Sequence, residues 1–100
     1  MKVVSVDIKK SSKKGKKLVA QFKNKEGKII RTTHFGAKGM SDYTIHKDKE
    51  RRKRYRKRHR KDLDTKDFTR AGYLSFYVLW GDSSDLNTAI KDYKKRFKLN

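Results

Sequence analysis

Residues 49–61 (KERRKRYRKRHRK) carry the side chains of this chain whose chemistry is most evident. Ten of these thirteen residues are Lys or Arg and one is Glu, so the segment contributes +9 to a formal net charge of +19. Arginines outnumber lysines six to four, and the planar guanidinium suits paired hydrogen bonds to phosphate or carboxylate. Because like charges one turn apart destabilise a helix, the segment predicts contact with a polyanion or a strongly acidic surface. A solvated helix face and a nuclear localisation signal are the alternatives.

The candidate polyanion-binding residues come from this segment and from a lysine-rich loop near the N-terminus (SSKKGKK, residues 11–17). The loop is the weaker of the two signals, since lysines in hairpin loops are often only solvated. No part of the basic segment is suited to recognising a base sequence, so binding to nucleic acid would be driven by phosphate contacts and depend steeply on salt. The candidates are Lys49, Arg51, Arg52, Lys53, Arg54, Arg56, Lys57, Arg58, Arg60 and Lys61 in the segment, and Lys13, Lys14, Lys16 and Lys17 in the loop.

Catalytic chemistry has little support in this sequence. The three histidines have neither the spacing of HExxH nor that of a common zinc site. Asp42, His46 and Asp48 are the one set that could form a carboxylate–imidazole site. We expect structural roles instead: Asp42 capping a turn, Asp48 capping a helix and His46 bonding locally. The sequence therefore predicts a protein that is not an enzyme, with no catalytic residue, metal, cofactor or small-molecule substrate.

One small domain must position these side chains. The chain has 100 residues, of which 33% are hydrophobic, so the core is small and the isolated domain is marginally stable. Residues 1–35 predict a β-meander, residues 36–48 a glycine-containing loop, residues 49–61 a basic helix and residues 71–98 an apolar and an amphipathic helix. Alternating apolar residues predict the first two strands, and a β-branched run at residues 28–35 predicts the third. The alternating positions are Val4, Val6 and Ile8, then Leu18, Ala20 and Phe22.

The C-terminal third predicts two helices. Residues 71–80 (AGYLSFYVLW) are apolar on all sides, which favours a buried helix over a strand, with Gly81 ending it. Ser83 or Ser84 is then expected to cap a last helix. Its apolar positions have amphipathic spacing: Leu86, Ala89, Ile90, Tyr93 and Phe97. The fold class is thus α+β, a small three-stranded antiparallel sheet packed with a basic helix and two C-terminal helices.

The aromatic residues are expected to build the core and to hold the basic helix in place. Tyr55 and His59 lie one turn apart and are predicted to dock that helix on the sheet. The larger set could stack on nucleic-acid bases, but core packing is the preferred interpretation because the chain has few other large apolar groups. That set is Phe22, Phe35, Tyr73, Phe76, Tyr77, Trp80, Tyr93 and Phe97.

Nothing in the sequence predicts a membrane-spanning or secreted protein. The longest apolar run, residues 73–80, is interrupted by Ser75 and is far shorter than a bilayer span. The N-terminus lacks an apolar stretch of signal-peptide length, and the absence of Cys fits a reducing compartment. We expect a location in the cytoplasm, in the nucleus or inside a particle assembled there.

Several motifs together resemble a known family. The chain contains FG-x-x-G-x-SDYT-x-HKD (residues 35–48), then R-x-x-RY-x-x-RH (residues 51–59), an AGY…LW segment and a terminal KDYKKRF. Over roughly residues 18–98 it resembles small basic, uncharacterised proteins of large nucleocytoplasmic DNA viruses. The motif residues of greatest interest are Phe35, Gly36, Gly39, Asp42, Tyr43, His46, Asp48, Tyr55, His59 and Trp80.

The resemblance implies a viral setting and a place in the virion, assembled in the host cytoplasm or nucleus. It supplies no catalytic residue. Two functions are compatible with it. One is a minor capsid or cement component whose basic helix lies against acidic capsid or other virion proteins. The other is a genome-packaging protein that contacts the phosphate backbone of DNA or RNA without sequence preference.

Overall fold

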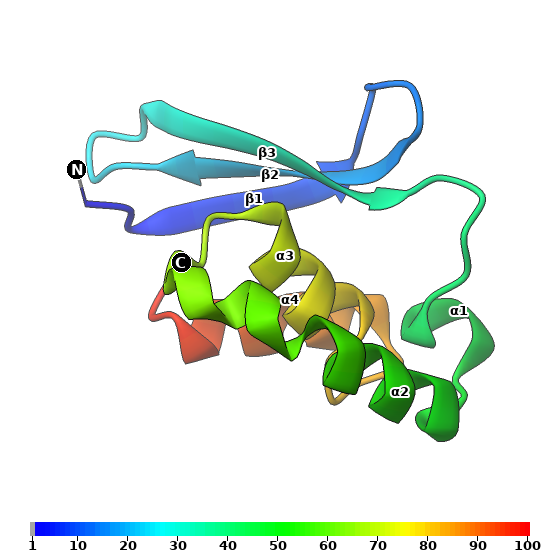
Figure 1. The fold of residues 1–100 in the computed structure, drawn as a ribbon. Coiled ribbons are helices and arrows are strands. Elements are labelled where there is room, and N and C mark those ends of the chain that lie inside the picture. The colour runs from blue at the N-terminus through cyan, green and yellow to red at the C-terminus, as the bar shows by residue number, and fades with distance from the viewer. Residues whose placement is uncertain (1) are drawn as a thin grey trace.

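The computed structural model describes residues 2–100 and has a sheet layer and a helix layer (Figure 1). The sheet contains β1 (Ser5–Lys10), β2 (Lys16–Lys23) and β3 (Ile29–Ala37), paired antiparallel in the order β1-β2-β3. The helices lie on one face of this sheet. The predicted α+β class with a three-stranded antiparallel meander is confirmed. The helical elements are α1 (Tyr43–His46), α2 (Lys49–His59), the 3₁₀ helix η1 (Arg60–Thr65), α3 (Ala71–Leu74), the π-helix η2 (Ser75–Leu79) and α4 (Leu86–Arg96).

The region between the sheet and the basic helix differs from the predicted loop. β3 continues to Ala37, two residues beyond the predicted end, because Ala37 pairs with Lys16 of β2. Gly36 makes this possible with a φ of 78°, a value that favours glycine. The loop also contains the short helix α1, which sequence periodicity could not reveal because a single helical turn is too short to show a repeat.

The helical prediction for residues 71–80 is confirmed, with α3 leading directly into η2. A side chain at Gly81 would place Cβ 2.1 Å from the carbonyl oxygen of Tyr77, so only glycine fits where the segment ends. The predicted serine caps of α4 are wrong. The cap is Asp85, whose carboxylate accepts a hydrogen bond from the Thr88 amide at 2.9 Å, while the Ser83 hydroxyl accepts one from the Asp85 amide at 3.0 Å.

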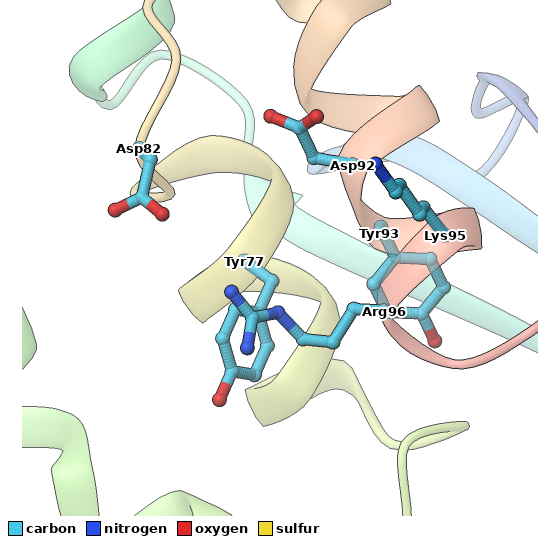
Figure 2. A pocket seen from close by; sticks show the side chains of 6 residues that line it. All are labelled: Tyr77, Asp82, Asp92, Tyr93, Lys95 and Arg96. Atoms are coloured by element: carbon cyan, nitrogen blue, oxygen red, sulfur yellow. The ribbon is translucent and has the colours of Figure 1, made fainter.

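α4 packs beside η2 through its predicted amphipathic face. Ala89 and Tyr93 are buried, and the other apolar positions of the helix pack against the core. On the outer side, Figure 2 shows Arg96 reaching across to Tyr77. The Arg96 guanidinium lies 4.5 Å from the centre of that ring. This cation–π contact joins α4 to η2 on their outer side.

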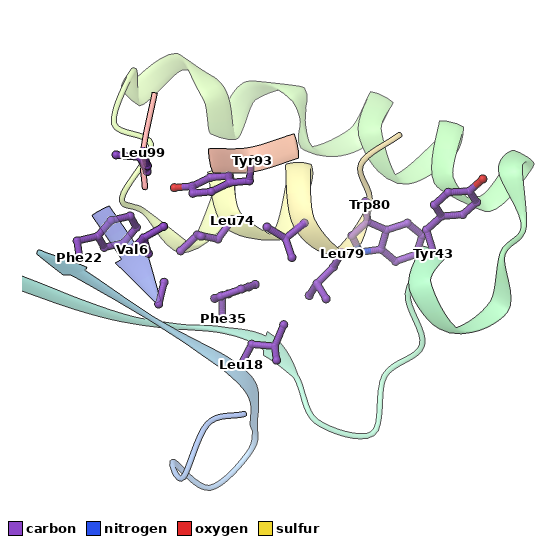
Figure 3. Packing of buried hydrophobic residues seen from close by; sticks show 12 residues of the cluster. Val6, Leu18, Phe22, Phe35, Tyr43, Leu74, Leu79, Trp80, Tyr93 and Leu99 are labelled. Atoms are coloured by element: carbon purple, nitrogen blue, oxygen red, sulfur yellow. The ribbon is translucent and has the colours of Figure 1, made fainter. Parts of the chain in front are cut away.

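The core lies between the sheet and the α3–η2 segment (Figure 3). Val6, Phe22 and Phe35 of the sheet are each at most 1% exposed, and Leu74 and Tyr93 meet them from the helices. Core packing of the aromatic set is confirmed, since six of its eight members are buried. Tyr77 and Phe97 are half-buried and pack against the same cluster.

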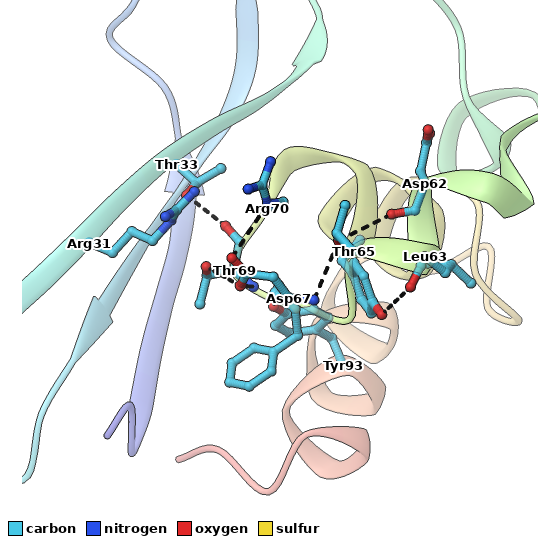
Figure 4. Close-up of polar contacts among 11 residues, drawn as sticks. Arg31, Thr33, Asp62, Leu63, Thr65, Asp67, Thr69, Arg70 and Tyr93 are labelled. Atoms are coloured by element: carbon cyan, nitrogen blue, oxygen red, sulfur yellow. Dashed lines mark hydrogen bonds and ion pairs between the residues drawn. The ribbon is translucent and has the colours of Figure 1, made fainter. Parts of the chain in front are cut away.

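Polar contacts join η1 and the turn after it to the rest of the molecule (Figure 4). The Thr33 hydroxyl of β3 donates to the Thr69 carbonyl oxygen at 2.7 Å, and the Tyr73 hydroxyl donates to the Leu63 carbonyl oxygen at 2.6 Å. The Tyr93 hydroxyl donates to the Phe68 carbonyl oxygen at 2.5 Å, and burial raises the pKa of this phenol. These contacts join η1 to α3, and the turn after η1 to β3 and α4. Within residues 2–100, no helix has the length and apolarity needed to cross a membrane.

Candidate polyanion-binding surface

Two aspartate caps set the position and start of α2. Asp42 caps α1, accepting a hydrogen bond from the Thr44 amide at 2.8 Å, and its second carboxylate oxygen binds the Lys17 ammonium at 2.5 Å. Asp48 caps α2, and its Oδ1 accepts from the Glu50 amide at 3.0 Å and the Arg51 amide at 3.3 Å. Both predicted caps are confirmed. The pKa of Asp48 lies below its usual value, chiefly because the Arg51 amide stabilises the carboxylate.

One side of α2 attaches the helix to the rest of the fold. Arg52, Tyr55, Arg56 and His59 follow the spacing i, i+3, i+4 and i+7, and all four are partly buried. We call these four residues the docking face. The Tyr55 ring lies 4.2 Å from the Trp80 ring, with 7° between their planes, and His59 stacks on the other side of Tyr55 at 4.1 Å.

Tyr55 and His59 were predicted to dock the helix on the sheet, and the sheet is the wrong partner. Tyr55 packs on Trp80, which directly follows η2, and not on a strand. The physical reason is that Leu74, Val78 and Leu79 of the α3–η2 segment already fill the sheet's apolar face. The basic helix thus packs against the end of this helical segment.

Two of the ten candidate cations are engaged within the protein. Arg52 donates to the Gly81 carbonyl oxygen at 3.0 Å, and Arg56 donates to the Asp82 carboxylate at 3.0 Å. The Arg56 guanidinium also lies 4.7 Å from the centre of the Phe76 ring. Both arginines are 24% exposed, so they serve mainly to hold the helix. Sequence reasoning missed this role because it looked for apolar residues at helical spacing.

The other eight cations face outward. We call them the basic face, and within the part of the chain that the structure describes none of them forms an ion pair. Unpaired cations gathered on one short helical segment repel each other, and a negatively charged partner relieves that repulsion. The eight exposed residues are Lys49, Arg51, Lys53, Arg54, Lys57, Arg58, Arg60 and Lys61.

The four lysine candidates of the N-terminal loop separate into two groups. Lys13 and Lys14 are exposed in the β1–β2 connection. Lys16 and Lys17 line a cleft that also contains Arg51 and Arg58 of α2, so the structure brings these two lysines to the basic helix. Lys17, however, is not available to bind a polyanion, and its prediction as a binding residue is wrong. It is 16% exposed and its ammonium is bound to Asp42, so its charge is neutralised inside the protein.

The residues of the catalytic alternative have structural tasks. His46 Nδ1 accepts a hydrogen bond from the backbone amide of Asp48 at 2.9 Å, as expected of a local contact. The carboxylates of Asp42 and Asp48 are both used as helix caps. Across residues 2–100, no group of three or more His, Cys, Asp or Glu side chains could hold a metal ion. The two aspartates therefore cap helices, and His46 makes a local hydrogen bond.

The motif that carried the resemblance is explained largely by packing around Trp80. The His46 ring lies 5.2 Å from the Trp80 ring and is tilted against it by 53°, whereas the Tyr55 ring is nearly parallel to Trp80. The Tyr43 ring lies 6.3 Å from the His46 ring. A Cβ at Gly36 would lie 2.8 Å from the Leu79 Cδ1, so a side chain there would displace Leu79. The motif thus encodes the support beneath the basic face.

A family model matches residues 6–59, which is more than half of the chain, and its description is "Family of unknown function (DUF5754)". The chain belongs to this family. The match begins in β1 and ends at the last residue of α2, so the DUF5754 region includes the sheet, both aspartate caps and the whole docking face. No curated protein and no solved structure matches the chain. The resemblance to viral proteins stays a prediction.

Proposed function

We propose that this DUF5754 protein is a non-enzymatic structural component of the virion of a large double-stranded DNA virus. It acts as a minor capsid or cement protein and lays its basic face against acidic surfaces of its neighbours. One observation carries the proposal: the eight cations of the basic face, six on α2 and two at the start of η1, are unpaired and exposed, while Arg52, Tyr55, Arg56 and His59 attach α2 from its opposite side.

The fixed orientation of the charge favours a structured partner. A disordered basic tail would neutralise a polyanion without a capped start or an aromatic anchor. Here the segment spans about 20 Å if it is helical throughout, and η1 at its end is tied to α3 by the hydrogen bond from Tyr73 to Leu63. Arginine in such a preorganised setting loses less conformational entropy on binding. This arrangement suits a specific interface.

The viral setting rests on the motif resemblance and is compatible with the composition. A virion protein is surrounded by neighbours that bind only its folded form, and such binding stabilises a chain with a small core. A net charge of +19 on 100 residues disfavours self-association and favours association with acidic subunits. The proposal does not depend on any catalytic group.

Fractionation of purified virus particles tests this function. Particles are disrupted gently, the shell and the genome are separated, and the protein is quantified in each fraction. The proposal expects the protein in the shell fraction, released by high salt. Absence of the protein from particles would overturn the proposal. Recovery of the protein in the genome fraction, from which nuclease releases it, would overturn it as well.

The second candidate is a sequence-independent nucleic-acid-binding protein. The lack of ion pairs on the basic face favours it, because phosphates could occupy all eight cations. Duplex DNA binding across a salt series is the test. If most of these cations contact phosphate, the log–log slope approaches about −0.9 per contact, and charge reversal at Arg51, Arg54 and Arg58 reduces it. Weak binding at low salt would remove this candidate.

A further inference from the structure

A cleft of 460 Å³ opens between the end of the sheet, the loop before α1 and one flank of α2. Four Lys or Arg side chains line it. Lys17 is paired with Asp42, and the other three are Lys16 from β2 and Arg51 and Arg58 from the basic segment. None of the three forms an ion pair within residues 2–100. Seven residues separate the two arginines, which corresponds to about 10.5 Å along a helix.

One carboxylate of the cleft is neutralised inside the protein, and the other is hydrogen-bonded to a histidine. Asp42 is 2% exposed and bound to Lys17 at 2.5 Å, and Asp62 lies 3.2 Å from the Nδ1 of His59. The three unpaired cations therefore dominate the charge of the cleft. An anionic ligand that enters it would be attracted by Lys16, Arg51 and Arg58 together.

The cleft also offers an apolar surface. Met40 lines it and is 66% exposed, although methionine is usually found inside proteins. Buried Phe35 and Leu79 form part of the lining. Exposed methionine beside arginine is typical of surfaces that bind proteins, because the flexible thioether adapts to a partner's side chain.

We infer that this cleft binds an extended acidic segment of a partner protein, with carboxylates at Arg51, Arg58 and Lys16 and an apolar side chain against Met40. The inference rests on the proposed function and names the part of the neighbour that the protein recognises. A strand rises about 3.3 Å per residue, so about three residues of the ligand span the two arginines. The apolar wall favours a peptide with an apolar side chain over a chain of phosphates.

The test uses fluorescein-labelled Glu-Glu-Leu-Glu-Glu-Leu and the 100-residue chain, with anisotropy as the readout. Arg51→Glu with Arg58→Glu changes the cleft, and Lys53→Glu with Lys57→Glu is the control with the same charge change on the outer side of α2. We expect the first double variant to weaken binding at least about tenfold and the control less than about threefold. Equal weakening in both variants would overturn the inference, as would a wild-type protein that does not bind the peptide.

The apolar contact has its own test. Met40→Ser is expected to weaken binding of the leucine peptide and to leave binding of Glu-Glu-Ser-Glu-Glu-Ser unchanged. Amide chemical shifts of the wild-type protein provide a measurement that needs no variant. Peptide should shift the amides of Gly36, Met40 and Arg58. Shifts confined to Lys53 and Lys57 would contradict the inference. Oligo-dT that displaces the peptide and whose own binding requires Arg51 and Arg58 would also contradict it.

These results are separable from the proposed function. A shell location in fractionated particles combined with failure of the peptide to bind would remove the cleft inference alone. A genome location would remove the proposed function, and the peptide titration would still decide whether the cleft recognises acidic peptide.

Discussion

The Tyr55 ring lies flat on the Trp80 ring, with centroids 4.2 Å apart and 7° between the planes. This contact joins the most basic segment of the chain to the end of its most apolar segment. Trp80 is 9% exposed, so its far side is anchored in the core. The stack therefore gives a helix without an apolar stripe an aromatic attachment beside those of Arg52 and Arg56, and the charges on its outer side have a fixed orientation.

Tyr55→Ala should destabilise the fold. The substitution removes a partly buried ring that contacts both Trp80 and His59, and the expected loss in the free energy of unfolding is about 2 kcal/mol. Denaturant unfolding followed by tryptophan fluorescence measures it. Lys57→Ala, on the exposed side of the same helix, should stay within about 0.5 kcal/mol of wild type. Equal stability of Tyr55→Ala and Lys57→Ala would mean that the stack does not hold α2.

Two arginines of α2 should respond oppositely to the same substitution. Arg56→Gln removes the contacts to Asp82 and Phe76 and should lower stability by about 1 kcal/mol, with little effect on polyanion binding. Arg54→Gln should leave stability unchanged and lower the salt concentration that elutes the protein from immobilised polyglutamate. Since both variants lose one charge, a similar elution shift for both would show that net charge alone governs binding.

Gly36→Ala should destabilise the protein more than Gly39→Ala. Both glycines have positive φ, at 78° and 90°, which costs another residue about 1 to 2 kcal/mol. At Gly36 the added Cβ would also lie 2.8 Å from Leu79 Cδ1, whereas nothing lies within 4 Å at Gly39. Overpacking adds about 1 kcal/mol or more at Gly36. Thermal unfolding of both variants checks the order, and the reverse order would contradict the packing described at the end of β3.

Asp48→Asn should change how stability depends on pH. The pKa of Asp48 is lowered in the folded protein by hydrogen bonds from the Arg51 and Glu50 amides. Its contribution is therefore fully present above the unfolded-state pKa of about 3.9 and disappears as pH falls toward the lower folded value. Asparagine keeps the capping oxygen without the charge. The difference in Tm between wild type and variant should be present at pH 6 and shrink below about pH 4. A difference that stays constant down to pH 2 would exclude this role.

Much of the architecture follows from local patterns. Alternation at Val6, Leu18, Ala20 and Phe22 predicted two strands because these side chains share the face of the sheet that packs in the core. The amphipathic repeat around Tyr93 predicted α4 for the same reason. The caps of α1 and α2 were predictable because a side chain bonds to amides two or three residues away. Each of these contacts lies within one element or one turn.

The support beneath α2 could not be predicted in the same way. Its docking face contains two arginines, and hydrophobic periodicity gives them no weight even though their stems pack and their guanidinium groups find partners. The partners, Gly81 and Asp82, lie 29 and 26 residues away in sequence and meet Arg52 and Arg56 only in the folded chain. The cleft has the same origin, since β2 contributes Lys16 and α2 contributes Arg58.

Incorporation into virus particles tests the central claim most directly. Arg51, Arg54 and Arg58 are changed together to Glu, and the control changes Lys25, Lys28 and Lys91, which are exposed elsewhere, to Glu as well. Both proteins carry the same net charge, and circular dichroism verifies that they are folded. The account predicts that the α2 variant is lost from the shell of purified particles and that the control is retained at the wild-type level. Equal incorporation of the two variants, or equal loss, would contradict the claim that a fixed basic face on α2 is what the partner recognises.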